Sequence, residues 1–399
     1  MLIKKHILIV APYITFPNEP GANRFIAVAK KLSQKYSVTL VTSKFCHILK
    51  SIRVQNPNMQ DFFKVILIDE PGYQKNVSLK RLLSHHVFCK NFEQFLASYN
   101  HPIDLAYSAY PLIKTNYILG KYKKKYGYKL VIDVQDIWPE AISGPIPIFS
   151  NVIAQKILSP ITRYANTTYG LADGLVAVSN TYLKRSDVKN LDDNLKKVVY
   201  IGADNLHFEN CYKEQKAQKI IATYIGTMAG SYDLETVVKA AALCHKYIDI
   251  QFIGTGPHEK NLVNLNRECG GYVKFLGIKS YKDAMKILVS SDIAINPIKE
   301  SAQQSITNKL SDYFCCGLPI ISCQQSEEVK ELLALGGGVQ YCANNATDLA
   351  KQLIKLSQDR ETLEKMSLVN QNIAKERFLR DISYNEISHL VDKLILSDK

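Results

Sequence analysis

The residues best suited to chemistry are a lysine and an aspartate, Lys309 and Asp312, in the stretch SITNKLSDYFCCGLPIIS at 305–322. Thr307 and Asn308 are residue types that cap helix starts, so we predict a short helix that begins here. Three positions along a helix span about 4.5 Å and place both side chains on one face. A helix start, a lysine and a carboxylate could bind the diphosphate and the ribose diol of a nucleoside diphosphate. The alternative is a capped helix with an ion pair on a solvated face.

Short apolar runs alternate with segments of helical periodicity along most of the chain, a pattern typical of parallel sheets with helical crossovers. The first set of expected strands comprises 6–13, 37–43, 65–70, 104–110, 129–136, 174–179 and 198–204. The second set comprises 219–226, 248–256, 273–278, 292–298, 318–323 and 339–342. We therefore predict an α/β protein with two doubly wound, Rossmann-like domains that face a cleft.

A polar stretch without periodicity, NLHFENCYKEQKAQ at 205–218, is typical of a linker between these domains. We assign residues 1–204 to an N-terminal domain and residues 219–379 to a C-terminal domain. After residue 344 the pattern is helical only. We expect the last helix, within 380–399, to cross back onto the first domain, because it has no sheet of its own to cover.

Composition sets wide limits on function. The chain has 399 residues, of which 46% are hydrophobic and 22% are charged, as in ordinary globular proteins. No apolar run approaches the roughly 20 residues of a membrane-spanning helix, and no signal-type segment follows Met1, so we expect a cytoplasmic protein. The nine cysteines lack disulfide or zinc spacings. A net charge of +13 predicts an acidic partner, which could be nucleic acid, anionic lipid or a phosphorylated substrate.

The loop TFPNEPGANRF at 15–25 follows the first expected strand. Open parallel sheets bind ligands at the C-terminal ends of their strands, so such loops are expected to contain binding residues. Gly21, Asn23 and Arg24 are candidate substrate-binding residues here, because glycine permits close backbone approach and Arg24 opens a helix at a position suited to an anion. The alternative is a plain loop.

The segment DVQDIWPE at 133–140 follows the fifth expected strand. Asp136 could act there as a base or a hydrogen-bond acceptor, next to Gln135 and to Trp138, which is the only tryptophan. The alternative is an aspartate that caps a helix and a tryptophan that belongs to the core.

Two glycine-containing loops, YIGTMAGSYDL and FIGTGPHEK, follow the first two strands of the second domain. Gly226, with Thr227 next to it, and Gly254 and Gly256 would let backbone amides approach a diphosphate or a base. A single Gly-x-Gly is common in tight turns. Two such loops in consecutive units, followed by the 305–322 stretch, form a more specific pattern.

These stretches together resemble a known family. In order, GTMAGSYDLETVVKAA, IQFIGTGPHEKNL, VKFLGI, SSDIAINPI and NKLSDYFCCGLPII are similar to the nucleotide-sugar domain of retaining glycosyltransferases of family 4, which have the GT-B fold. GANRFIAVAKKLSQKYSVTLVTS resembles that family's glycine loop, helix and second strand. DVQDIWPEAISG resembles the D-x-W-P segment of members that build bacterial cell-surface polysaccharides. The resemblance covers nearly the whole chain, most specifically 219–323.

The resemblance implies a role for the residues around the predicted helix. Lys309 would bind the donor diphosphate, helped by amides near Thr307 and Asn308, and is the first catalytic candidate. Asp312 occupies the position where the family usually has a ribose-binding glutamate. Gln304 occupies the position of the family's other acidic residue, which contacts the donor sugar.

The resemblance also implies transfer from a nucleotide sugar, a UDP-sugar above all, with retention of configuration and without a metal or other cofactor. The sequence has no Asp-x-Asp motif, the metal clamp of the other common glycosyltransferase fold. Gln135 and Asp136 occupy the region where many relatives have a histidine that faces the donor sugar, and Asp136 is the second catalytic candidate. GTMAGSYDL lacks the arginine and lysine of many relatives.

The acceptor implied is lipid-linked, on polyprenyl diphosphate, or an oligosaccharide. SLKRLLSHHVFCKNF at 78–92 places Lys80, Arg81, His85, His86 and Lys90 among leucines, and KYKKKYGYK adds five lysines. Such a basic amphipathic surface would bind an anionic inner leaflet, which predicts a peripheral protein on the inner face of the cytoplasmic membrane. The alternative is an ordinary solvated helix.

Three other functions remain to be weighed. A nucleic-acid binder would fit the charge, but no recognition helix, finger or aromatic RNA-binding pattern is present. A noncatalytic scaffold subunit of a polysaccharide assembly would fit Gln304 and the missing histidine. A UDP-sugar epimerase would share the fold and the donor site but needs further acid–base groups.

Overall fold

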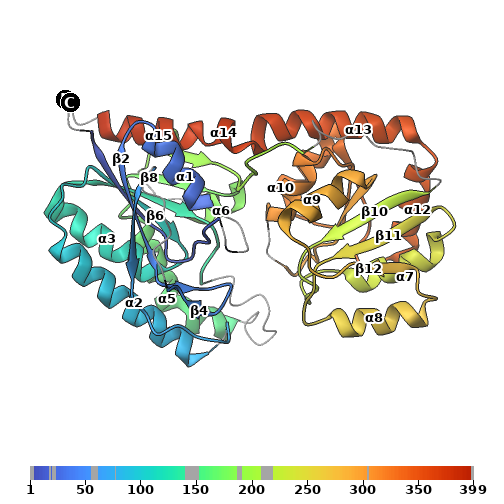
Figure 1. Ribbon diagram of the computed structural model, residues 1–399, viewed down its shortest axis with the longest axis horizontal. Coiled ribbons are helices and arrows are strands. Elements are labelled where there is room, and N and C mark those ends of the chain that lie inside the picture. The colour runs from blue at the N-terminus through green and yellow to red at the C-terminus, as the bar shows by residue number, and fades with distance from the viewer. Residues whose placement is uncertain are drawn as a thin grey trace. The chain divides into compact units, whose positions relative to one another are not determined.

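The computed structural model describes residues 4–17, 19, 24–54, 62–76, 78–139, 152–186, 191–207, 219–302 and 305–396, and within 152–157 it describes the backbone alone. The chain divides into two compact units (Figure 1). The first comprises Met1–Val199 with Tyr384–Lys399, and the second comprises Tyr200–Ser383. The division lies a few residues from the predicted limits of 204 and 380, and 208–218 of the predicted linker lie outside the described residues.

The first unit is built on a parallel sheet. Its seven strands within the described ranges have the order β5-β2-β1-β6-β7-β8-β9. Their bounds are β1 His6–Val10, β2 Ser37–Ser43, β5 Lys64–Ile68, β6 Leu105–Tyr110, β7 Lys129–Val134, β8 Gly174–Ala177 and β9 Lys196–Val198. Burial on both faces explains their continuous apolar runs, with all residues of β6 buried.

Helices connect these strands and cover the sheet. They are α1 Arg24–Ser33, α2 Leu79–Ser98, α3 Ile113–Tyr126, α5 Val152–Tyr169, α6 Asn180–Ser186 and α15 Asn385–Leu396. A two-residue antiparallel pair, β3 Phe45–Cys46 and β4 Ser51–Ile52, was not predicted, because its strands are too short to show a period. The run 198–204, predicted as a strand, meets β9 only at Val198, and Ala203 instead pairs with Leu379 in the second unit.

The last helix, α15, belongs to the core of the first unit, as predicted. Its residues Ile387, Leu390, Val391 and Leu394 are buried in the same hydrophobic cluster as strand β1. Figure 1 shows α15 beside α1 and β8. A Cβ atom at Gly174 of β8 would lie 3.0 Å from Leu394 Cδ1, so glycine leaves the room that the helix needs.

The second unit also has a parallel sheet. Its six strands within the described ranges have the order β12-β11-β10-β13-β14-β15. The strands are β10 Ile220–Ile225, β11 Ile248–Ile253, β12 Val273–Phe275, β13 Ile293–Asn296, β14 Ile320–Ser322 and β15 Gly338–Gln340. The helices are α7 Leu234–Cys244, α8 Glu259–Glu268, α9 Tyr281–Ser290, α10 Asn308–Cys315, α11 Glu327–Leu332, α12 Ala346–Ser357, α13 Arg360–Ile373 and α14 Arg380–Ser383. Each predicted strand of this half overlaps an observed one, which confirms two Rossmann-like units.

We expect the substitution Leu390→Ala to lower the free energy of unfolding by about 2–5 kcal/mol, because it empties a buried site between α15 and the sheet. Leu396→Ala is the matched control on the same helix, since its side chain is 56% exposed, and should cost about 0.5 kcal/mol or less. Urea unfolding followed by circular dichroism measures both. Equal midpoints for the two variants would contradict the placement of α15.

Candidate functional site

Helix α10 begins where the sequence predicted. Thr307 is its N-cap, with an extended backbone, and its carbonyl accepts from the amides of Leu310 and Ser311 at 3.1 and 3.2 Å. The first amides of a helix have no acceptor within the helix. The hydroxyl oxygens of Thr307 and Ser311 are also buried without a hydrogen-bond partner among the described residues. The start of α10 therefore offers polar groups to a ligand.

Lys309 is buried, with 8% of its surface exposed. Its Nζ lies 3.4 Å from the ring centroid of Tyr232 and 4.6 Å from that of Tyr224, and donates to the Tyr224 hydroxyl at 3.3 Å. In the part of the chain that the structure describes, no carboxylate lies within ion-pair distance of Nζ. Burial lowers the pKa of Lys309 well below its usual value. The aromatic faces thus hold an amino group that has no anionic partner among the described residues.

The two glycine loops lie against this lysine and against each other. A Cβ atom at Gly226 would lie 3.0 Å from Lys309 Nζ, and one at Gly254 would lie 2.1 Å from the Gly226 carbonyl oxygen. Both glycines have positive φ, of 141° and 126°. Gly256 lies close to the backbone of Met228: a Cβ atom added at Gly256 would be 2.3 Å from the Met228 carbonyl oxygen. The Thr227 carbonyl accepts from the Tyr224 hydroxyl at 2.8 Å.

The structure therefore brings together five of the residues that the sequence identified, Gly226, Thr227, Gly254, Gly256 and Lys309. They form one layer beyond the C-terminal ends of β10 and β11.

Asp312 is half-buried and does not pair with Lys309, so the alternative of a simple surface ion pair does not hold. Its Oδ1 accepts from the Tyr281 hydroxyl at 2.9 Å. Burial raises the pKa of Asp312 to about 7, against the opposing effects of this hydrogen bond and of the Arg380 charge. Asp312 is thus a carboxyl that changes charge near neutral pH.

A chain of buried polar side chains holds the segment that leads into α10, and the sequence analysis missed it. Ser305 donates to Glu328 Oε2 at 3.0 Å, and Tyr200 donates to Glu328 Oε1 at 2.9 Å. Gln324 Nε2 donates to the Ser305 carbonyl at 2.8 Å and its Oε1 accepts from Asn296 at 2.9 Å. The available signal was the polar run CQQSEE directly after a strand, at the edge where ligands bind.

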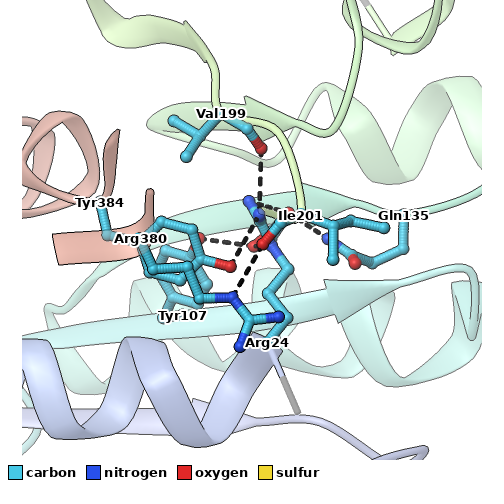
Figure 2. A network of polar contacts seen from close by, with 8 residues as sticks. Arg24, Tyr107, Gln135, Val199, Ile201, Arg380 and Tyr384 are labelled. Atoms are coloured by element: carbon cyan, nitrogen blue, oxygen red, sulfur yellow. Dashed lines mark hydrogen bonds and ion pairs between the residues drawn. The ribbon is translucent and has the colours of Figure 1, made fainter. Parts of the chain in front are cut away.

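Arg24, in the first unit, has protein partners instead of the predicted anion (Figure 2). Its guanidinium donates to both carboxylate oxygens of Asp133, at 2.9 and 3.3 Å, and also to the Val199 carbonyl and the Tyr384 hydroxyl. Only 3% of its surface is exposed. The reason is that the carboxylate of Asp133, on β7, faces the start of α1 and is fully buried.

Gln135 also contacts Asp133, to which its Nε2 donates at 2.6 Å (Figure 2). Asp136 lies at the end of β7 as predicted, half-buried, with Oδ1 accepting from the Ile137 amide at 2.8 Å. Burial raises the pKa of Asp136, against the opposing hydrogen bonds from this amide and from Trp138. The remaining candidates Gly21, Asn23 and Gln304 lie outside the described residues.

Most of the second unit is similar to a known protein family. Residues 219–359 match the model of the family described as glycosyl transferases group 1. No curated protein has a sequence significantly similar to this chain.

Solved structures of similar fold span the whole chain. HepE from Anabaena, in complex with UDP and glucose, is 17% identical, with 98% of this chain and 100% of that chain covered and a TM-score of 0.69. Sucrose-phosphate synthase from Thermosynechococcus elongatus is 13% identical, with coverage of 99% and 100% and a TM-score of 0.72. WaaG, a glycosyltransferase involved in lipopolysaccharide biosynthesis, is 11% identical, with coverage of 96% and 99% and a TM-score of 0.64.

Residues 219–359, which contain the glycine loops and the buried lysine, are thus similar to the glycosyl transferases of group 1, and the chain has the GT-B fold.

Proposed function

We propose that this protein is a retaining glycosyltransferase that moves a sugar from a UDP-sugar to a lipid-linked or glycan acceptor in the synthesis of bacterial cell-surface polysaccharide, such as O-antigen or capsule. The observation that supports it most is the buried Lys309, which lies beside two glycine loops and has no carboxylate within ion-pair distance among the described residues. The complexes of HepE with UDP and glucose support the choice of donor, and the role of WaaG in lipopolysaccharide biosynthesis supports the choice of pathway.

The chemical task in this proposal is to stabilise charge that grows on a diphosphate leaving group. Lys309 and the free amides at the start of α10 would perform it without a metal ion or another cofactor. Their effect is large in a buried site, because a low dielectric strengthens charge interactions. A diphosphate near Nζ would also favour the charged form of Lys309, whose pKa burial lowers in the free protein. Asp136, whose pKa burial raises, is the second catalytic candidate.

The ribose would bind at Asp312. One carboxylate oxygen accepts from Tyr281, and the other can accept the hydroxyls of the ribose diol. Lys309 and Asp312, three positions apart on α10, would then bind the two ends of one nucleoside diphosphate.

The acceptor would be reached at an anionic membrane surface, with the protein bound peripherally to the inner face of the cytoplasmic membrane. Helix α2 exposes Leu79, Leu82 and Leu83 by 83%, 63% and 58%, and Lys80 and Lys90 are also exposed. Apolar side chains next to lysines fit the boundary between headgroups and acyl chains. Among the described residues, no helix combines the length and the apolar character needed to cross a membrane.

The function is tested by the release of UDP from UDP-sugars, with and without a polyprenyl-diphosphate-linked sugar. We expect release to depend on the acceptor and Lys309→Ala to lower kcat by about 100-fold or more. Lys239→Ala is the control, because that lysine is exposed on α7. Isomerised donor would indicate an epimerase, and tight UDP binding without turnover would indicate a scaffold. Full activity of a folded Lys309→Ala protein would refute the diphosphate role.

The affinity for uridine should rise about tenfold between pH 6 and pH 8. The ribose hydroxyls need the ionised Asp312, whose pKa is about 7 in the free protein, so protonation below this value competes with binding. Uridine is the chosen ligand because it has the ribose but no phosphate that titrates in this range. The Asp312→Asn variant should bind weakly and show no such pH dependence by NMR titration. A wild-type affinity that stays constant over this range would argue against Asp312 as the ribose acceptor.

Membrane binding should depend on the exposed leucines of α2. We expect the wild-type protein to sediment with vesicles that contain phosphatidylglycerol but not with pure phosphatidylcholine vesicles, and the double change Leu82→Gln with Leu83→Gln to reduce the bound fraction severalfold. Leu243→Gln, at a leucine 56% exposed on α7, is the matched control. Equal binding of both variants would remove α2 from the membrane contact.

A further inference from the structure

A second group of aromatic and cationic side chains lies in the first unit, around the ring of Tyr73. The Tyr73 cluster, as we call it, consists of Tyr13, His47, Lys50, Tyr73, Arg81, His85 and Trp138. Three of its aromatic residues come from segments that follow β1, β5 and β7. The C-terminal ends of parallel strands meet at one edge of a sheet, which is where ligands bind in such folds.

Two cations of the cluster converge without a carboxylate partner in the part of the chain that the structure describes. Lys50 Nζ lies 4.9 Å and Arg81 Cζ lies 5.5 Å from the ring centroid of Tyr73. Both donate to Asn76, Lys50 to Oδ1 at 2.6 Å and Arg81 to the backbone carbonyl at 2.7 Å. Within the described residues neither forms an ion pair. Like charges that are held together repel, so an anion bound between them would be favoured.

The backbone of Lys50 adopts an energetically unfavourable conformation. Its φ is 55°, in the left-handed region that non-glycine residues seldom adopt. Gln74 donates to the Lys50 carbonyl at 3.1 Å, which secures this conformation. Strained residues of this kind concentrate at ligand sites.

One acidic residue of this region, Glu70, is already engaged. Glu70 is buried and accepts hydrogen bonds from the hydroxyls of Ser43 and Ser84. Burial raises the pKa of Glu70, against the effect of these two hydrogen bonds. Its charge is therefore directed at serines and leaves Arg81 and Lys50 available.

The histidines and aromatic rings complete a surface suited to a sugar. Burial, followed by the nearby cations, lowers the pKa of His47 and of His85 to about 4, so both rings are neutral at pH 7. His47 Nδ1 lies 2.5 Å from the Tyr73 hydroxyl, and His85 Nε2 forms a hydrogen bond with the Tyr13 hydroxyl. The Arg81 guanidinium also lies 5.7 Å from the ring centroid of Trp138. Aromatic faces beside polar groups are usual in small-molecule sites.

We propose that the Tyr73 cluster binds an anionic group, a phosphate or a carboxylate, on the sugar of the glycan acceptor. Arg81 pairs with the anion through its planar fork and Lys50 adds a second positive charge. The sugar ring lies against the face of Trp138, which is partly exposed, whereas Tyr73 is buried and positions the two cations. This assignment of an acidic acceptor rests on the proposed function, in which helix α2 of the first unit contacts the membrane where the acceptor is reached.

Direct binding tests this assignment on the full-length protein. The probes are glucose 1-phosphate, glucuronic acid and, as the neutral control, methyl glucoside, each titrated by NMR. We expect the anionic probes to bind more tightly than methyl glucoside, and Arg81→Gln to raise the dissociation constant of the better anion by about tenfold or more. Lys80→Gln is the matched control, since it removes the same charge from the adjacent, exposed position of α2. Lys50→Gln, which leaves α2 unchanged, should weaken the same probe.

Titration of UDP into the same samples separates this assignment from the proposed function. UDP should bind wild-type and Arg81→Gln proteins equally, because the donor residues lie in the other unit. Loss of anion binding in Arg81→Gln supports the assignment to the Tyr73 cluster, whether or not UDP binds. If neither the wild-type protein nor any variant binds UDP, that result refutes the donor site and not the Tyr73 cluster. A preference for glucose 1-phosphate or for glucuronic acid identifies the anionic group. The assignment is overturned if neither anion binds, if methyl glucoside binds as tightly, or if Lys80→Gln causes the same loss as both Arg81→Gln and Lys50→Gln.

Discussion

The organisation of the second unit depends on the burial of one amino group, Lys309 Nζ, among groups that do not neutralise it. Removal of a cation from water is costly unless other groups compensate. Here two tyrosine faces compensate in part, and two glycines leave the space that Nζ and the backbone occupy. A side chain at Gly226 or Gly254 would collide with Nζ or with the neighbouring loop. An anionic ligand next to Nζ would stabilise this arrangement further, because it would supply the missing opposite charge.

The sequence predicted the positions of the strands well, because a buried parallel strand leaves an apolar run that a single segment displays. It also assigned Lys309 and the glycine loops to the same ligand, a nucleoside diphosphate, and in the structure they meet because both follow strands that end at the same edge. The predicted role of Asp312 is to accept hydrogen bonds from a ribose. Its contact with Tyr281 was not predicted, because it joins α10 to α9 and no pattern in the local sequence indicates it. Periodicity identifies elements, whereas pairs of side chains from distant segments are fixed only by packing.

Arg24 illustrates the same limit. An arginine at a helix start suits an anion, and the sequence alone does not say whether that anion is a ligand or a buried carboxylate. Asp133 occurs in the middle of the run KLVIDVQD, which was predicted as a strand. It was therefore treated as an ordinary strand residue and not as the partner of Arg24. The structure resolves this through a buried ion pair that also receives Tyr107, whose hydroxyl donates to Asp133 at 2.6 Å. The polar chain through Gln324 and Glu328 was missed for a similar reason.

The position of α15 in the core of the first unit has a consequence for synthesis. The residues Ile387, Leu390, Val391 and Leu394 are made after the whole second unit, yet they complete the hydrophobic cluster that strand β1 begins. Domains tend to fold in the order in which they leave the ribosome. In this chain the uninterrupted segment from Tyr200 to Ser383 can close its own core first, while the earlier-made sheet keeps an uncovered apolar face until α15 has been made. A nascent chain that stalls before α15 would therefore present that face to chaperones.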